Sequence, residues 1–354
     1  GSRALRAQGD RDGDQGVGTA GAGIVIDGLS PSALNDEYIA MLSETGVTGW
    51  HKSLGGLQSF ADSWEYLYAK PDKAVLSATA ADGEAAAAAG RIAVIFGWQS
   101  ASPLGDKSGQ SFFLGDANPA DRTELRAYYH LGLRVVNLTY NTVNAFGAGC
   151  LEPHLGITRA GRRLVEEIHD LGILLDVGGH TGERTSLDAI EMTSGVPVIC
   201  SHTNVAALCD NPRNTSDRVL EAIAGTGGVI GVSAINDFVA RCPGDRATPV
   251  TPQADLETLL DHYDYLKRLV GAEHVGIGAD FTFGSNIAID PDNVLFGREM
   301  ASEQAPIYYV EGFEDITELP NLAAGLERRG WTAAERAAVL GGNWLRVYRA
   351  AWGS

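Results

Sequence analysis

The stretch Ile173–His180 reads Ile-Leu-Leu-Asp-Val-Gly-Gly-His, and Val196–His202 reads Val-Pro-Val-Ile-Cys-Ser-His. Each is a short apolar run that ends in glycine or polar residues. Near-continuous apolar runs of this length are typical of parallel strands that are buried on both faces. An amphipathic segment, Ser186–Ser194, lies between the two runs and fits a helix. Strand, helix and strand in this order predict a βαβ unit of a parallel sheet.

The same alternation recurs along the chain and gives eight apolar runs in total. The other six are Ile24–Asp27, Val47–His51, Ile92–Phe96, Val135–Thr139, Gly228–Val232 and Val275–Gly278. Further amphipathic stretches separate them, among them Asn35–Thr45, Pro119–Leu131, Thr158–Leu171, Ser216–Thr226 and Pro252–Val270. Eight strand–helix units in about 260 residues predict an α/β fold with a closed (β/α)8 TIM-type barrel. An open doubly wound sheet is the alternative, but the segment after the first run, Asp27–Pro31, is no glycine-rich phosphate loop.

Residues with known helix-end preferences support these boundaries. Thr158 and Ser216 stand where an N-cap hydroxyl is expected. Gly132 and Gly172 follow helical patterns at the position where a left-handed glycine often ends a helix. The helical patterns therefore begin and end on residues that favour such ends.

Composition excludes several classes of protein. The chain has 354 residues, 44% of them hydrophobic, and a formal net charge of −18. Nucleic-acid binding requires a basic face, which such a balance does not offer. An anionic membrane surface would repel the chain for the same reason. The sequence contains no apolar run of 18 residues, so it predicts no spanning helix.

The chain is expected to form one domain behind a short tail. Residues 1–23 are rich in Gly and Asp and contain no apolar core, which predicts a disordered tail. Residues 24–354 then form a single barrel domain with C-terminal helices. No signal peptide is visible, which favours a cytoplasmic protein, although a leader removed before residue 1 stays open. The expected partner is a small molecule or short peptide, and a homodimer stays open.

Three histidines and an aspartate follow predicted strands. His51, His180, His202 and Asp280 each stand at the end of a different apolar run. Because the active site of such a barrel lies at the carboxyl ends of its strands, we expect these side chains to converge. Neutral imidazole nitrogen and anionic carboxylate oxygen are the donors of zinc sites. His180, His202 and Asp280 are therefore candidate ligands and candidate catalytic groups, although a single histidine after a strand is more often a satisfied structural residue.

Other candidates lie in the loops at the same end. Arg213 would bind a substrate carboxylate in bidentate fashion, or else pair with Asp210 or Asp217. Trp98 and Tyr140 would form apolar walls of the mouth, or else pack in the core. The remaining candidates for substrate contact are Gln99, Asn141, His51 and Glu152. His51 is disfavoured as a metal ligand because Lys52 brings a positive charge beside it.

Ordered motifs then point to a family. They are Leu131-Gly132-Leu133-Arg134, Leu138-Thr139-Tyr140-Asn141, His180-Thr181-Gly182, Val198-Ile199-Cys200-Ser201-His202, Pro212-Arg213-Asn214, Gly276-Ile277-Gly278-Ala279-Asp280 and Gly342-Asn343-Trp344. The chain after Ile24 resembles the renal (membrane) dipeptidase family of amidohydrolase-like metallopeptidases. The resemblance implies a (β/α)8 barrel that cleaves dipeptides, usually with two zinc ions.

The resemblance also implies roles for four residues. His180 and His202 match the two histidine ligands of one metal, and Asp280 matches the aspartate that handles the catalytic water. Arg213 matches the arginine that binds the substrate carboxylate. The chain departs from the family at three metal positions. Leu29 and Pro31 stand where the family has a His-x-Asp motif, and Gln99 stands where it has a bridging glutamate.

These departures limit the metal content. A bridging carboxylate offsets the repulsion between two cations, which a neutral amide does not do. We therefore expect one zinc ion, or none, rather than two. The histidine that the family often carries after the fourth strand is replaced by Tyr140.

Three functions remain open at this point. The first is a metal-dependent, dipeptidase-like hydrolase that acts on a small peptide or peptide-derived amide. The second is a natural-product tailoring enzyme that uses the same pocket for isomerisation, elimination or epimerisation, with Asp280 and His180 or His51 and Glu152 as acid and base. The third is a binding protein without catalysis.

Overall fold

The computed structural model describes residues 23–104, 122–240, 253–284 and 307–353, and for residues 122 and 123 only the backbone. Residues 1–22, the bulk of the predicted tail, lie outside the described residues. Within the described residues, no helix is both long enough and apolar enough to cross a membrane.

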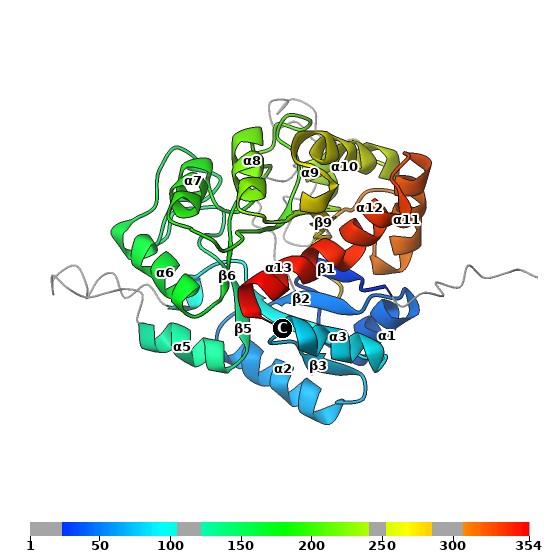
Figure 1. The fold of residues 1–354 in the computed structure, drawn as a ribbon, viewed down its shortest axis with the longest axis horizontal. Coiled ribbons are helices and arrows are strands. Elements are labelled where there is room, and N and C mark those ends of the chain that lie inside the picture. The colour runs from blue at the N-terminus through cyan, green and yellow to red at the C-terminus, as the bar shows by residue number, and fades with distance from the viewer. Residues whose placement is uncertain (1–22, 105–121, 241–252, 285–306, 354) are drawn as a thin grey trace, which may run out of the picture.

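Parallel strands form the inner layer of the molecule, and helices surround them (Figure 1). The strands are β1 Ile26–Ser30, β2 Gly49–Ser53, β3 Ala74–Leu76, β4 Ile92–Trp98, β5 Leu133–Asn137, β6 Leu174–Asp176, β7 Cys200–Thr203, β8 Ile230–Val232 and β9 Val275–Ile277. Their order in the sheet is β6-β5-β4-β2-β1-β9-β8-β7. A parallel bridge between Asp176 and Ile199 brings the two ends of this order together. The eight strands therefore form a nearly closed barrel, as the sequence predicts.

The strand β3 was not expected from the sequence. It has only three residues, Ala-Val-Leu. It pairs in parallel with β4 alone and stands outside the strand order given above. A run this short gives no periodicity to detect. The eight predicted apolar runs each overlap one of the other strands, and β3 adds a ninth to the sheet without entering the barrel.

The helices follow the strands in alternation. They are α1 Asp36–Glu44, α2 Leu57–Ala69, α3 Ala80–Ala88, α5 Arg122–His130, α6 Arg159–Asp170, α7 Glu183–Glu191, α8 Asp217–Gly225, α9 Asn236–Val239, α10 Leu256–Val270, α11 Leu319–Arg328, α12 Ala333–Ala337 and α13 Asn343–Trp352. The predicted N-cap Thr158 accepts a hydrogen bond from the Gly161 N–H. Ser216 is the N-cap of α8, as predicted, but its side chain makes no capping hydrogen bond. Gly132 and Gly172 have φ of 107° and 71°, as glycines after a helix do.

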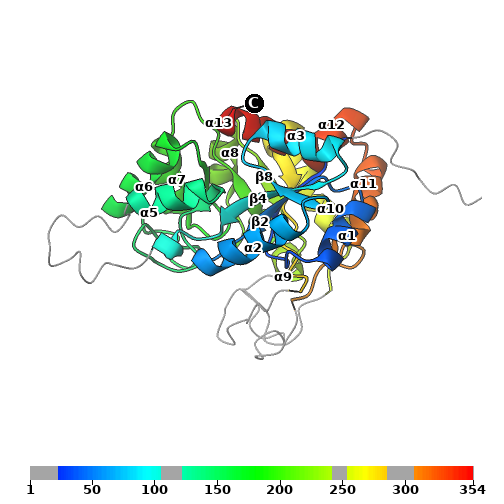
Figure 2. The ribbon, with the colours of Figure 1, turned by 90° about the horizontal axis from the view of Figure 1, so that it is seen from below.

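One end of the barrel is filled with apolar side chains. Trp344 on α13 packs there with side chains from six strand regions, namely Ile26, Ile95, Val135, Leu174, Ile199 and Val229. Its indole N–H donates to the Ile277 carbonyl at 2.9 Å. A Cβ at Gly28 would lie 2.2 Å from the Trp344 ring, so the ring requires glycine at this strand position. Figures 1 and 2 show α13 across this end and α9 at the opposite end. Any site inside the barrel must therefore open at the carboxyl ends of the strands.

Candidate active site

Two histidines meet at the open end of the barrel. His180 follows β6 after two glycines, and His202 lies within β7. Their Nε2 atoms are 3.1 Å apart, and the two rings are nearly perpendicular, at 66°. Both side chains are buried. Neighbouring strands of the barrel thus bring together the two histidines that the sequence singled out.

The other nitrogen of each ring contacts an oxygen. His180 Nδ1 lies 2.7 Å from Asn141 Oδ1, and His202 Nδ1 lies 2.7 Å from Ser201 Oγ. Burial, together with the charge of Arg213, holds the pKa of both imidazoles well below the ordinary value. Both rings are therefore neutral near pH 7, which is the form that binds a metal ion or accepts a proton.

Asp280 stands beside this pair. It follows β9, and its Oδ2 lies 3.9 Å from His202 Nε2. Burial raises the pKa of Asp280 to about 7, and the charge of Arg213 opposes that rise. Its backbone φ is 63°, which is rare for a residue other than glycine and costs conformational energy. Strain at a residue of this kind is found where a side chain is held for a function.

Arg213 is buried behind the histidines without a partner of opposite charge. Its side chain is 1% exposed, and Nη1 donates to the His202 carbonyl at 3.1 Å. Nε and Nη2 are buried and make no hydrogen bond, and no carboxylate of the described residues pairs with the guanidinium. A Cβ at Gly179 would lie 2.0 Å from Nη1, so the glycine before His180 makes room for the arginine. A buried guanidinium of this kind is suited to an anionic group of a ligand.

Gln99 and Tyr140 contact His180 directly. Gln99 Oε1 lies 3.1 Å from His180 Nε2, at the end of β4. The Tyr140 ring stacks on the imidazole with centroids 4.0 Å apart, while 47% of the residue is exposed. Asn141, whose φ is 60°, is the second non-glycine residue with a left-handed backbone among those described. Of the residues predicted for substrate contact, these three lie against the histidine pair.

Three other predicted residues make no hydrogen bond or ring contact with the histidine pair among the described residues. Trp98 is fully buried in the core, where its indole N–H donates to the Gly55 carbonyl and its ring packs on Tyr128, so it forms no wall of the mouth. His51 is fully buried as well. Its Nδ1 lies 2.6 Å from the Gly28 carbonyl, and burial lowers its pKa to about 4. Glu152 lies in the turn after Cys150, with Oε2 buried and without a hydrogen bond.

The donor atoms present fit one cation better than two. Among the described residues no three His, Cys, Asp or Glu side chains form a cluster that would hold a metal, so the predicted ligand set His180, His202 and Asp280 is not assembled as such. The two imidazoles nevertheless have their Nδ1 atoms occupied by oxygens and their Nε2 atoms facing each other. This is the arrangement in which metal-ligating histidines are held.

A second metal position is not supported. Leu29, at the end of β1, is buried, and it belongs to none of the three apolar clusters of the described residues. With Pro31 two positions later, neither side chain offers a ligand where the resemblance requires one. Besides the Asp280 carboxylate, the neutral carboxamide of Gln99 offers an oxygen atom beside the histidines.

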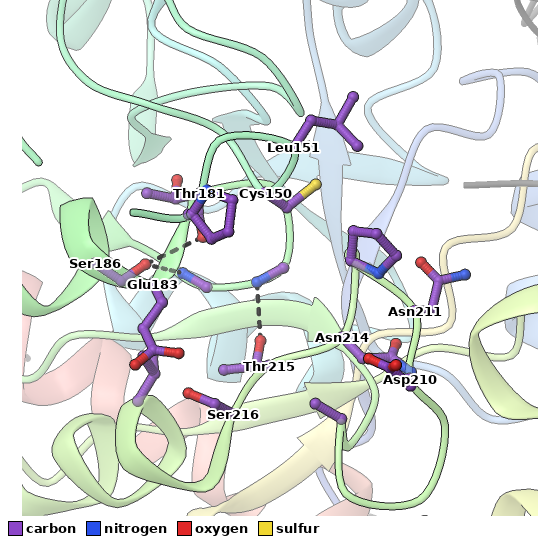
Figure 3. A pocket seen from close by; sticks show the side chains of 17 residues that line it. Cys150, Leu151, Thr181, Glu183, Ser186, Asp210, Asn211, Asn214, Thr215 and Ser216 are labelled. Carbon is purple, nitrogen blue, oxygen red and sulfur yellow. Dashed lines mark hydrogen bonds between the residues drawn. The ribbon is translucent and has the colours of Figure 1, made fainter. Parts of the chain in front are cut away.

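A cavity of about 580 Å³ adjoins the loop that carries His180 (Figure 3). Gly178 and Gly179 line it, and the Gly179 N–H donates to Thr215 Oγ1 at 2.9 Å. In Figure 3, Glu183 and Asp210 lie on opposite sides with Thr215 between them. The described residues that line the cavity include no lysine, arginine or histidine. Neither His180 nor His202 is among the described residues that line the cavity.

Sequence reasoning missed two residues next to His202. Ser201 Oγ contacts both His202 Nδ1 and Asp176 Oδ2, the latter at 2.5 Å. A signal for both was present in the sequence. Asp176 is a carboxylate inside an otherwise apolar run, Ile173–Val177, and a buried charge in a strand requires a partner. Ser201 directly precedes a histidine at a strand end.

Comparisons with known proteins identify relatives over most of the chain. The sequence profile described as membrane dipeptidase, peptidase family M19, matches residues 56–294 and 304–352. A Klebsiella pneumoniae protein, described as an uncharacterized protein in the pqqA 5' region, is 31% identical over 238 residues, which are 65% of this chain and 76% of that protein. Dipeptidase 3 of Rattus norvegicus is 31% identical over 232 residues, which are 64% of this chain and 41% of that protein. The chain thus matches less than half the length of the rat relative.

Solved structures share the fold. A crystal structure described as an amidohydrolase from Pseudomonas aeruginosa has a TM-score of 0.78 and 28% identity, and covers 94% of this chain and 97% of its own. The structure of a dipeptidase of family M19 has a TM-score of 0.73 at 21% identity, and covers 94% of this chain and all of its own. At that identity, the second likeness supports the barrel fold alone.

Proposed function

The chain belongs to the membrane dipeptidase family, and from that premise we propose that it is a dipeptidase-like hydrolase that cleaves the amide bond of a small peptide or peptide-derived compound with one zinc ion. One observation carries the proposal. At the open end of the barrel a buried imidazole pair, a carboxylate 3.9 Å from it and a buried arginine without an ionic partner among the described residues lie within one cluster. These groups are the parts that amide hydrolysis requires.

His180 and His202 would hold the ion through their Nε2 atoms. A bound zinc ion supplies Lewis acidity to a carbonyl oxygen. Arg213 would bind the carboxylate of the substrate through Nε and Nη2, which have no partner among the described residues. This contact would fix the scissile amide relative to the histidines, and fixed orientation is a large part of catalysis.

Asp280 would move the proton. As a water molecule attacks the amide carbon, one of its protons passes to Asp280 Oδ2. When the C–N bond breaks, the same proton passes to the leaving amine. A carboxyl group whose pKa lies near 7 is suited to both transfers, because it changes protonation state near neutral pH.

The test compares dipeptides with their C-terminal amides on zinc-loaded protein. We expect hydrolysis of dipeptides, with KM at least about tenfold lower than for the matching amides, since a charge-assisted contact to Arg213 is lost in the amide. Arg213→Lys keeps the charge but loses the bidentate geometry, so it should raise KM for dipeptides and remove most of this preference. Arg268→Lys, on the exposed face of α10, is the control.

Metal analysis completes the test. One equivalent of zinc per chain, with activity lost on chelation and restored by zinc, is the expected result. Two equivalents would contradict the single position. Absence of hydrolysis for every dipeptide tried, with zinc bound, would reject the hydrolase.

A second candidate function has one observation in its favour: the neutral Gln99 and the apolar Leu29 stand where the family has metal ligands. Reduced metal binding would suit a tailoring enzyme that performs isomerisation, elimination or epimerisation on a peptide-derived compound. Reaction in H₂¹⁸O separates the two, because only hydrolysis places one ¹⁸O atom in the carboxylate that forms.

A further inference from the structure

The cavity of about 580 Å³ does not include the groups proposed for catalysis. The loops after β5, β6 and β7 and the first turns of α7 and α8 line it. None of His180, His202, Arg213 and Asp280 is among the described residues of its lining. Pockets that hold small molecules have volumes of about 300–1,000 Å³. The cavity therefore has the size of a binding site of its own.

The charged side chains of this cavity are acidic. Figure 3 shows Glu183 and Asp210 on opposite sides of it, and the described lining residues include no lysine, arginine or histidine. Glu183 has one long ionic contact, 3.9 Å from its Oε1 to Nη1 of Arg218, whose side chain is 72% exposed. No ion pair between described residues includes Asp210. A cation that enters the cavity would therefore be attracted from two sides.

Two buried oxygens of lining residues have no hydrogen-bond partner among the described residues. Asn214 is 9% exposed, and its Nδ2 donates to the Cys209 and Phe238 carbonyls, both at 2.8 Å. Its Oδ1, which only accepts, has no donor. Ser216 Oγ is also buried and makes no hydrogen bond. A buried acceptor without a donor costs free energy, and an N–H donor of a ligand would offset that cost.

Two other features would favour an anion instead. The helices α7 and α8 begin at the cavity, and helix N-termini attract negative charge. Arg213 also lies behind the lining residue Gly179. However, Glu183 and Asp217 stand in the first turns of α7 and α8, where their negative charges already offset the helix ends. The carboxylates and unpartnered acceptors therefore favour a cationic ligand that donates hydrogen bonds.

Apolar side chains complete the lining, namely those of Leu151, Pro153, Pro212 and Val219. Surfaces of this kind cover the methylene groups of a long amine, while its charged end stays at a polar group. We propose that this cavity binds an aliphatic diamine, with one ammonium group at Glu183, the other at Asp210 and the methylene chain against the apolar wall. The proposal goes beyond the proposed function, because it uses neither the histidine pair nor a metal ion.

The first test compares three probes of the same length by calorimetric titration of metal-free protein. They are 1,5-diaminopentane, the neutral 1,5-pentanediol and the anionic glutarate. We expect saturable binding of one diamine per chain, and at least about tenfold weaker binding of the diol and of glutarate, because both lack the charge-assisted contacts. Equal affinity for the diol would reject the role of charge. Tighter binding of glutarate would show that the helix ends and Arg213 make this an anion site.

The second test locates the diamine and removes its partners. Backbone amide signals of Gly179 and Thr215, which line the cavity, should shift on titration. Asp210→Asn and Glu183→Gln should each weaken binding by about 2- to 5-fold, the usual range for partly exposed ion pairs. Ser216→Ala should weaken it as well and leave the fold intact, since Ser216 Oγ makes no hydrogen bond in the protein.

A matched control separates this site from general attraction to an acidic protein. Glu221→Gln removes the same charge from the exposed side of α8, outside the lining of the cavity. It should leave diamine affinity unchanged. Equal weakening by Glu221→Gln and Asp210→Asn, or wild-type affinity in folded Asp210→Asn and Glu183→Gln, would reject the proposal. Because the titrations use metal-free protein, failure of the proposed hydrolysis would not alter their result.

Discussion

At the end of the barrel where the strands begin, apolar side chains from six strand regions pack around Trp344, and the indole N–H has its partner. At the opposite end the interior holds buried imidazoles, carboxylates and a guanidinium, and several of their polar atoms lack partners. The apolar end therefore stabilises the fold, whereas burial of unpartnered polar atoms at the open end costs folding free energy. Buried polar atoms without partners need an explanation, and a ligand that completes them is one, so we propose that the functional site lies at the open end.

The largest expected effect comes from Asp280 at the open end. Asp280→Asn removes the group proposed to move the proton, and loss of a general base costs about 10²- to 10⁴-fold in kcat. Stability should not fall, because the amide carries no charge to bury. Dipeptide kinetics and denaturant unfolding measure the two effects together. A large loss of stability with little change in kcat would contradict this, because Asp280 would then stabilise the fold rather than act in catalysis.

The next effect belongs to the apolar end. Trp344→Ala leaves a cavity between α13 and the strands and should lower the free energy of unfolding by about 3–5 kcal/mol. The zinc affinity of the folded fraction should stay within a few-fold of wild type, because Trp344 lies at the end of the barrel away from the histidines. Unfolding by denaturant and zinc titration check this. Loss of zinc binding in a fully folded variant would show that the two ends are coupled.

Asp27 gives a pH dependence of stability. It is fully buried, its Oδ2 has no hydrogen bond, and burial raises its pKa to about 7. Because the folded pKa exceeds the unfolded value of 3.8, its contribution is complete below pH 4 and is lost as pH rises through about 7. At about 1.36 kcal/mol per pKa unit, the loss is about 4 kcal/mol.

The matched variant is Asp27→Asn, whose amide oxygen still accepts from the Ala279 and Leu29 N–H groups. We expect it to unfold with a smaller decrease in stability between pH 4 and pH 8 than wild type. Urea unfolding at several pH values measures this. Identical pH profiles for the two proteins would show that Asp27 does not carry the dependence.

The smallest expected effect concerns Tyr140. Its ring stacks on His180, and such a ring contact contributes about 0.5–1.5 kcal/mol. Tyr140→Leu should therefore weaken zinc or substrate binding by about 2- to 10-fold, whereas Tyr140→Phe keeps the stack and should match wild type. If Phe and Leu weaken binding equally, the hydroxyl rather than the ring is the group that matters.

The sequence alone determined the barrel. Apolar runs of strand length that alternate with amphipathic segments allow few other folds, because a strand buried on both faces must be covered by helices. Only β3 was missed, since three residues carry no pattern. The same reasoning placed His180, His202 and Asp280 at strand ends, and parallel strands bring their carboxyl ends together.

Only the tertiary structure decided what surrounds them. The 3.1 Å approach of two imidazoles, the contact of Ser201 with Asp176 and the burial of Arg213 without an ionic partner among the described residues arise between segments that are separate in sequence. Trp98 and His51 were predicted to contact substrate but are buried instead. A residue beside a strand end faces either the core or the mouth of the barrel, and small shifts in strand geometry decide which. Periodicity along the chain specifies which residues form strands, whereas distances between side chains depend on how those strands pack.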